Sequence, residues 1–202
     1  LEGRRVYGRF MMRRNQNKGK DQWQIWRMID FDPWPGFIPP IKPLRRVQIP
    51  QGDKYLYELK NEGIRIEAQL FKEASLWTES KDNWTNKLPL IAKGINELAV
   101  DSVILDGEIV SYDELGHTKL SLLQDNLDHH RFDLIHYVVS DILYLNGKDL
   151  RDLPLIERKL ILEELNLPSY FDYARYFFED GESFFQAAQS LNLEGIISKE
   201  ID

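Results

Sequence analysis

The chain has 202 residues, 43% hydrophobic and 29% charged, which is typical of a globular protein that buries a sizeable core. No apolar run reaches the roughly 18 residues of a membrane span, and the first residues lack a secretory pattern, so we expect a cytoplasmic protein without a membrane partner. The absence of cysteine excludes disulfides, thiol catalysis and thiolate metal sites, which leaves carboxylates, imidazoles and water to hold any metal.

The charge is distributed unevenly along the chain. Residues 1–48 contain eleven Lys or Arg and four Asp or Glu, a net of +7, whereas the remainder carries −14, for a total of −7. A basic segment attached to an acidic body predicts an anionic partner such as a nucleic acid. A solvated charged face explains many such runs equally well, so both interpretations stay open.

The N-terminal residues 1–31 show the alternation of two strands, at 6–13 and 23–29, joined by the polar loop 15–21. This pattern predicts a β-hairpin. The residues that follow are rich in proline, which excludes a helix or an interior strand, so we expect an extended linker over 32–50.

From residue 51 onward the pattern mixes strands and helices. Strands at 55–59 and 64–70 predict a hairpin around Asn61-Glu62-Gly63, and strands at 103–105 and 109–112 predict another around Asp106-Gly107-Glu108. The other expected elements are a strand over 136–145 that stops at Asn146-Gly147, helices at 86–100, 154–166 and 182–191, and a short strand over 195–199. Helices and hairpins in this mixture indicate an α+β domain with mixed or antiparallel sheets and flanking helices.

Four short polar clusters lie at predicted strand ends or turns, where side chains reach the rim of a sheet. They are Lys60–Arg65, Asp106–Glu108, Ser140–Gly147 and Glu194–Lys199. Each alone has an ordinary explanation as a turn or as a helix end capped by glycine. Their occurrence in one chain is more informative than any one of them.

The order and spacing of these clusters resemble the adenylation domain of ATP-dependent DNA ligases, specifically the ligase module of bacterial DNA ligase D, over about residues 42–199. Lys60, Gly63 and Arg65 match the family's first motif, Lys-x-Asp-Gly-x-Arg, with Glu62 in place of Asp. The stretches 105–110, 141–147 and 193–199 match the third motif, its continuation and the fourth motif. The resemblance implies an ATP-grasp-like nucleotidyltransferase domain at 51–202, ending after the fourth motif.

The resemblance also implies roles for individual residues. Lys60 would be the catalytic nucleophile that attacks ATP and carries AMP. The nucleotide-binding residues would be Glu58, Lys60, Arg65, Glu108 and Lys199, and Glu108 and Glu194 would hold Mg²⁺ or Mn²⁺. Independently of the family, a lysine that attacks phosphorus must be neutral, which burial or nearby cations such as Arg65 and Lys199 promote. Charge that builds up on a leaving pyrophosphate favours cations and a metal.

The implied partners follow from the same family. AMP would pass to the 5′-phosphate of nicked or broken DNA during double-strand-break repair by non-homologous end joining. Other ligase D modules and the end-binding protein Ku are further expected partners, which would place the protein at the bacterial nucleoid. Residues 1–31 bear a second resemblance, to the closing strands of a 3′-phosphoesterase module.

Two positions depart from the ligase pattern. Thr78-Glu79 stands where the family has Ser-Arg, and Ser140 stands where an aromatic side chain usually stacks on adenine. The alternative of a non-catalytic, ligase-like module that binds a nucleotide or a DNA end as a scaffold therefore remains open. Formation of a covalent lysyl-AMP separates the two hypotheses.

Overall fold

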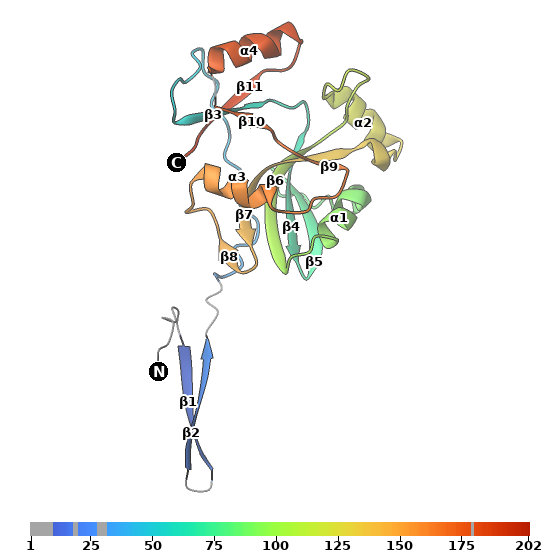
Figure 1. Ribbon diagram of the computed structural model, residues 1–202. Coiled ribbons are helices and arrows are strands. Elements are labelled where there is room, and N and C mark those ends of the chain that lie inside the picture. The colour runs from blue at the N-terminus through green and yellow to red at the C-terminus, as the bar shows by residue number, and fades with distance from the viewer. Residues whose placement is uncertain (1–9, 18–19, 28–31, 179) are drawn as a thin grey trace. The chain divides into compact units, whose positions relative to one another are not determined.

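The computed structural model describes residues 10–17, 20–27, 32–178 and 180–202, and the chain divides into two compact units, 1–34 and 35–202 (Figure 1). In the first unit, strands β1 (Phe10–Asn17) and β2 (Lys20–Arg27) pair antiparallel. The predicted hairpin is confirmed, but the predicted loop 15–21 is too long, because the strands stay paired as far as Asn17 and Lys20. The polar side chains that suggested a loop do not prevent the backbone from pairing. Residues 6–9 and 28–29, also expected in strands, lie outside the described residues.

The second unit contains two sheets. The small sheet has the order β10-β3-β11, with β3 in the centre and antiparallel to both neighbours. The large sheet has the order β5-β4-β6-β7-β8, and β9 pairs parallel with β7. The strands of the small sheet are β3 (Tyr55–Leu59), β10 (Tyr176–Phe177) and β11 (Ile196–Glu200). Those of the large sheet are β4 (Ile64–Phe71), β5 (Glu73–Thr78), β6 (Ser102–Val110), β7 (His136–Leu145), β8 (Lys148–Asp149) and β9 (Phe171–Tyr173).

The α-helices described beside these sheets are α1 (Pro89–Asn96), α2 (Leu120–Asp128), α3 (Leu155–Glu163) and α4 (Gly181–Ser190). Helix α1 packs on β4 and β5, α3 packs on β7, and α4 lies against the small sheet (Figure 1). Short 3-10 helices span Thr85–Lys87 and Phe132–Leu134. The predicted helices over 86–100 and 154–166 are real but shorter, since Pro89 and Leu155 begin them and residues 96 and 163 end them. The expected α+β class is confirmed.

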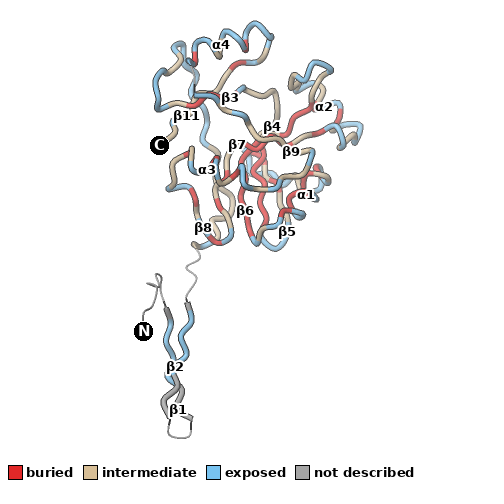
Figure 2. Tube along the Cα trace, viewed as in Figure 1, coloured by how far each residue is buried: buried red, intermediate tan, exposed pale blue. Residues whose placement is uncertain are grey.

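The core lies on the large sheet, whose strands carry most of the buried segments in Figure 2. Tyr137 is fully buried there, and its hydroxyl donates to the carbonyls of Ile66 at 2.9 Å and Leu105 at 3.2 Å. These bonds tie β7 to β4 and β6 through one side chain. No helix in the described part of the chain is long and apolar enough to span a bilayer.

The predicted hairpin of β3 with β4 is wrong, because the two strands belong to different sheets. The segment between them, residues 60–63, carries the chain from the small sheet to the large one. Gly63 serves close packing here, since a Cβ at this position would lie 2.5 Å from the Ile109 carbonyl oxygen. Lys60 therefore stands at the junction of the sheets and not on a hairpin turn.

The predicted hairpin around Asp106-Gly107-Glu108 is also wrong, because β6 runs without interruption from residue 102 to 110. Its register with β7 shifts between Asp106 and Gly107, which marks a β-bulge. A Cβ on Gly107 would meet the Val138 carbonyl and lie 2.9 Å from Cε2 of Tyr137. The glycine is required by close approach of β7, which the sequence alone does not distinguish from a turn.

The prediction for β7 is confirmed over 136–145, and so is the stop that follows. Asn146 and Gly147 have φ of 47° and 84°, the left-handed values of a tight two-residue hairpin turn into β8. The sequence did not lead us to predict α2, β5 or the short strands β8, β9 and β10. Helix α2 has nine residues and buries Leu123 and the polar Asn126, so few apolar residues mark its buried face.

Candidate nucleotide site

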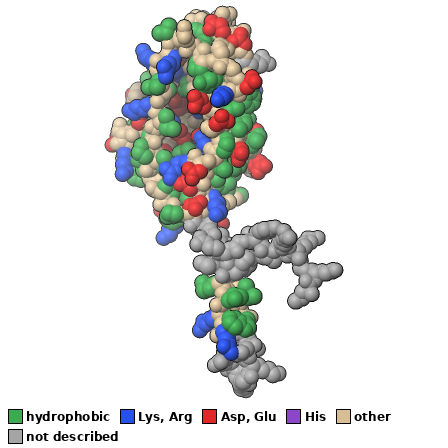
Figure 3. Space-filling model, turned by 90° about the vertical axis from the view of Figure 1, so that its left-hand side faces the viewer, with side chains coloured by type: hydrophobic (Ala, Val, Ile, Leu, Met, Phe, Trp, Pro, Cys, Tyr) green, Lys and Arg blue, Asp and Glu red, His purple; other side chains and the backbone are tan. Residues whose placement is uncertain are grey.

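The predicted site residues lie where the two sheets meet. Glu58 is on β3 and Lys60 follows it, while Lys199 is on the neighbouring strand β11. Arg65 on β4 stands directly opposite Glu108 on β6. The backbone N–H of Lys60 donates to the carbonyl of Gly195 at 2.9 Å, which brings Glu194 beside it. Three segments distant in sequence thus contribute to one charged region, and Figure 3 shows acidic and basic side chains interspersed on one face of this unit.

The amine of Lys60 forms an ion pair with Oε1 of Glu194. The two side chains are 41% and 33% exposed, so a solute can reach both. Arg65 and Lys199, the cations expected to act on Lys60, are each ion-paired with a carboxylate of their own. The Lys60 amine contacts the Glu194 carboxylate, and this contact must loosen before the amine can act as a nucleophile.

Arg65 is held by a two-pronged contact with Asp106. Its Nε and Nη2 lie 2.9 and 2.5 Å from Oδ1 and Oδ2 of that carboxylate. Burial alone would lower the pKa of Arg65, but the hydrogen bond and charge of Asp106 outweigh it, so the pKa is raised. Its remaining nitrogen, Nη1, donates to the Ile41 carbonyl at 2.7 Å. The guanidinium is thus a permanent cation with a fixed orientation.

Glu108 and Glu194 form the predicted pair of metal ligands. Burial raises the pKa of Glu108, and the charges of Asp106 and Glu194 add to this effect, while Arg65 and Lys60 oppose it. Within the described residues, no group of three or more His, Cys, Asp or Glu could hold an ion unaided. Glu108 and a second carboxylate whose charge acts on it nevertheless fit Mg²⁺, which commonly takes one or two carboxylates and completes its shell with phosphate and water.

Glu58 is buried, with only 3% of its surface exposed, and it faces two lysines. Its Oε2 lies 2.8 Å from Nζ of Lys199, and its Oε1 forms an ion pair with Lys159 on α3. Glu58 and Lys199, each predicted to bind the nucleotide, are therefore brought together by the fold. Sequence reasoning missed Lys159. The available signal was its spacing, since it falls between Leu155 and Leu162 on the buried stripe of α3, where an apolar residue is usual.

The two departures from the ligase pattern occupy defined places. The hydroxyl of Ser140 donates to the Asp106 carbonyl at 3.2 Å, and its own carbonyl accepts from Lys159 at 3.0 Å. Glu79 is ion-paired with Lys42, whose hydrogen bond and charge lower the pKa of that carboxyl. Ser140 thus bridges β6 and α3, and the negative charge of Glu79 is matched by a cation.

Residues 36–41, here called the connector, run across the face of β4 and are tied to it at three alternate positions. Gln69 donates to the Gly36 carbonyl at 3.0 Å, and the N–H of Ile38 donates to Oε2 of Glu67 at 3.0 Å. The third tie is the Arg65 contact with Ile41. Gln69 also donates to Glu67 at 2.6 Å. These bonds satisfy buried polar groups and join the connector to the arginine of the site.

Glu67 should make stability depend on pH. Burial raises its pKa from 4.5 to about 7, against the opposing hydrogen bonds from Gln69 and Ile38. Between these pH values the folded protein holds a proton that the unfolded chain has lost, so the free energy of unfolding should fall as the pH rises from 4.5 to about 7. The full effect is of the order of 3 kcal/mol.

Glu67→Gln tests this expectation, since it keeps the shape and cannot ionise. Urea unfolding between pH 4.5 and 8 should show the variant gaining stability relative to the original chain as the pH rises. The matched control is Glu97→Gln, because the side chain of Glu97 is 55% exposed. If the free energy of unfolding depends on pH in the same way for the Glu67 variant and the original chain, Glu67 is not the group responsible.

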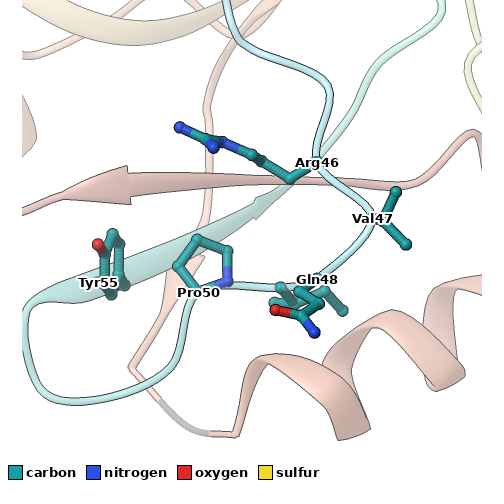
Figure 4. A pocket seen from close by; sticks show the side chains of 6 residues that line it. Arg46, Val47, Gln48, Pro50 and Tyr55 are labelled. Carbon is teal, nitrogen blue, oxygen red and sulfur yellow. The ribbon is translucent and has the colours of Figure 1, made fainter.

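A separate hollow lies beside the start of β3, lined by residues 46–50 and Tyr55 (Figure 4). The Tyr57 hydroxyl donates to the Pro50 carbonyl at 2.7 Å and fixes this segment. None of the predicted site residues lines the hollow. The charged region between the sheets therefore remains the candidate site.

Comparison with known proteins identifies the family. Residues 42–202 match the model of the ATP dependent DNA ligase domain. The chain belongs to this family. The chain is 34% identical over 173 residues to the multifunctional non-homologous end joining protein LigD of Pseudomonas aeruginosa, covering 84% of this chain and 20% of that protein. It is 29% identical to the SPbeta prophage-derived DNA ligase-like protein LigB of Bacillus subtilis, covering 81% of this chain and 61% of that protein.

Solved structures agree with this assignment at the level of the fold. The ligase domain of M. tuberculosis LigD superposes with a TM-score of 0.60 at 23% identity, covering 73% of this chain and 49% of that one. A mycobacterial DNA ligase D complexed with ATP and MES gives a TM-score of 0.59 at 22% identity, covering 73% and 48%. The predicted LigD-type nucleotidyltransferase fold is confirmed. This chain spans about a fifth of the P. aeruginosa relative and less than two thirds of the B. subtilis one.

Proposed function

We propose that this ligase domain transfers AMP from ATP to Lys60 and then to the 5′-phosphate of a DNA strand break. In the first step the nitrogen of Lys60 forms a bond to the α-phosphorus, the bond from that phosphorus to the bridging oxygen breaks, and pyrophosphate leaves. A protonated amine has no lone pair, so Lys60 must lose a proton first, and the Glu194 carboxylate contacts its Nζ. The DNA 5′-phosphate then takes AMP, and a 3′-hydroxyl displaces it.

The observation that carries this proposal is the meeting of Lys60, Glu194, Arg65 and Glu108 at the junction of the sheets. Arg65 supplies a fixed cation for the phosphates, and Lys199 offers a second one. Glu108 and Glu194 would hold Mg²⁺ or Mn²⁺, which would offset the charge that develops on the phosphates. Glu58, the buried carboxylate of the site, would contact the adenine base of ATP.

The wider role is part of the same proposal. The P. aeruginosa relative is named for non-homologous end joining, which supports nicked or broken DNA as the substrate. The partners implied by the family resemblance would be other LigD modules and Ku, at the nucleoid. Exposed Arg13, Arg14, Arg45 and Arg46 belong to the basic N-terminal segment and would contact DNA phosphates. A non-catalytic scaffold is not favoured, because the family match spans the whole candidate site.

The test is covalent labelling of the protein. Incubation with α-labelled ATP and Mg²⁺ or Mn²⁺ should give an acid-labile label on the peptide that contains Lys60, and nicked DNA with a 5′-phosphate should remove it. Nicked DNA with a 5′-hydroxyl is the control, because it has no phosphate to accept AMP. Label on another peptide, or no label with either metal, would contradict the proposal.

A further inference from the structure

Lys159 is a buried cation that the chemistry above does not use. It is 2% exposed, and helix α3 carries it to the interface between the two sheets. Its amine forms an ion pair with Glu58 of the small sheet and donates to the Ser140 carbonyl of the large sheet at 3.0 Å. The amine also lies 5.0 Å from the ring centre of Tyr176, a favourable cation–π position.

The place of Lys159 is fixed by its neighbour in the sequence. Arg158 donates to both oxygens of Asp141 on β7, at 2.9 and 2.8 Å, and to the Leu153 carbonyl. These contacts attach α3 to the large sheet. Lys159 therefore presents its amine from a rigid element, and its three partners leave it little freedom.

The two lysines that face Glu58 differ in exposure. Lys199, with a side chain 24% exposed, lies at the open side of the site, whereas Lys159 is sealed inside. A buried carboxylate that loses its last counterion is strongly destabilised. If Lys199 alone neutralised Glu58, it could not leave for a phosphate without this destabilisation. A second cation, which stays beside Glu58 when Lys199 leaves, removes this obstacle.

We propose that Lys159 is a positioning residue for the nucleotide: it keeps Glu58 ionised and in place, so that Lys199 can move to the phosphates and the freed Oε2 can accept a hydrogen bond from the amino group of a 6-aminopurine. This inference rests on the proposed role of Glu58 at the base. An ionised carboxylate accepts from a 6-amino group and repels a 6-oxo group, whereas a protonated carboxyl can donate to a 6-oxo group. Lys159 thereby selects adenine nucleotides without touching them.

The experiment compares the binding of ATP and ITP, which differ in this group. Equilibrium binding is measured on full chains that carry Lys60→Ala, so that no transfer occurs. Lys159→Met keeps the length of the side chain and removes the charge, and it should lower the preference for ATP over ITP by about tenfold or more. Lys159→Arg, which keeps the charge, should retain most of the preference. If Lys159 had a merely structural role, Lys159→Met would weaken the binding of ATP and ITP equally. An unchanged ratio of the two affinities in folded Lys159→Met would overturn the proposal.

A second comparison covers the case in which Lys159→Met alone fails to fold. Replacing both members of a buried ion pair is tolerated better than replacing one, so Glu58→Gln with Lys159→Met should fold. If Lys159 acts through Glu58, this double variant and Glu58→Gln alone should have the same ATP-to-ITP ratio. A ratio that differs between them would overturn the proposal. Binding is read without transfer, so failure of Lys60 labelling and failure of this inference are separate results.

Discussion

Lys60→Ala should reduce AMP transfer to the protein by more than about a thousandfold, because it removes the atom that bonds to phosphorus. Its effect on folding should be small. The side chain is 41% exposed and its partner Glu194 is 33% exposed, so water can solvate the Glu194 carboxylate once the ion pair is lost. Exposed pairs of this kind contribute about 0–1 kcal/mol. The measurement is the rate of label incorporation from α-labelled ATP, together with the urea unfolding midpoint.

Two further variants separate the nucleophile from its charge. Lys60→Arg keeps a cation beside Glu194 but remains protonated at any accessible pH, so it should be as inactive as the alanine variant. Lys93→Ala, on the exposed face of α1, should leave labelling unchanged. Substantial labelling of Lys60→Ala would assign the acceptor to another residue and remove the basis of the proposed first step.

The motif that contains Lys60 lies within six residues and is visible in the sequence, but the role of Lys60 followed from the resemblance of all four clusters to the ligase family and stays a prediction. The strand over 55–59 and the turn at Asn146-Gly147 could also be predicted, since apolar alternation and turn chemistry are local properties. The partners of these strands could not. Strand β3 pairs with β11, whose residue Ile197 stands opposite Glu58. No local pattern specifies a partner so distant in sequence, and the nearest predicted strand was chosen in its place.

The charged contacts of the site show the same limit. Glu58, Glu194 and Lys199 were predicted as site residues, but which cation would meet which carboxylate depends on how two sheets and a helix pack. Lys199 was expected to act on Lys60 and instead contacts Glu58. Lys159 was missed because a single lysine in a helix is usually exposed, and only its apolar neighbours at 155 and 162 indicate otherwise.

Gly107→Ala should destabilise the fold by about 3 kcal/mol, near the upper end for overpacking in a core. The added Cβ would meet the backbone carbonyl of Val138 and lie 2.9 Å from Cε2 of Tyr137. The ring cannot move aside easily, because its hydroxyl is bonded to two backbone carbonyls on β4 and β6. For a chain of this size the expected decrease in Tm is about 6–12 °C.

The matched control is Gly116→Ala, which tests backbone conformation without crowding. Gly116 has φ of +79°, and a Cβ added to it would have no other atom within 4 Å, so alanine there should cost only about 1 kcal/mol. Equal losses of stability in the two variants would show that close approach is not what requires Gly107.

The crowding at Gly107 also has a consequence for the site. Gly107 lies between Asp106, which holds Arg65, and Glu108, so a displaced β6 should slow AMP transfer beyond the loss of folded protein.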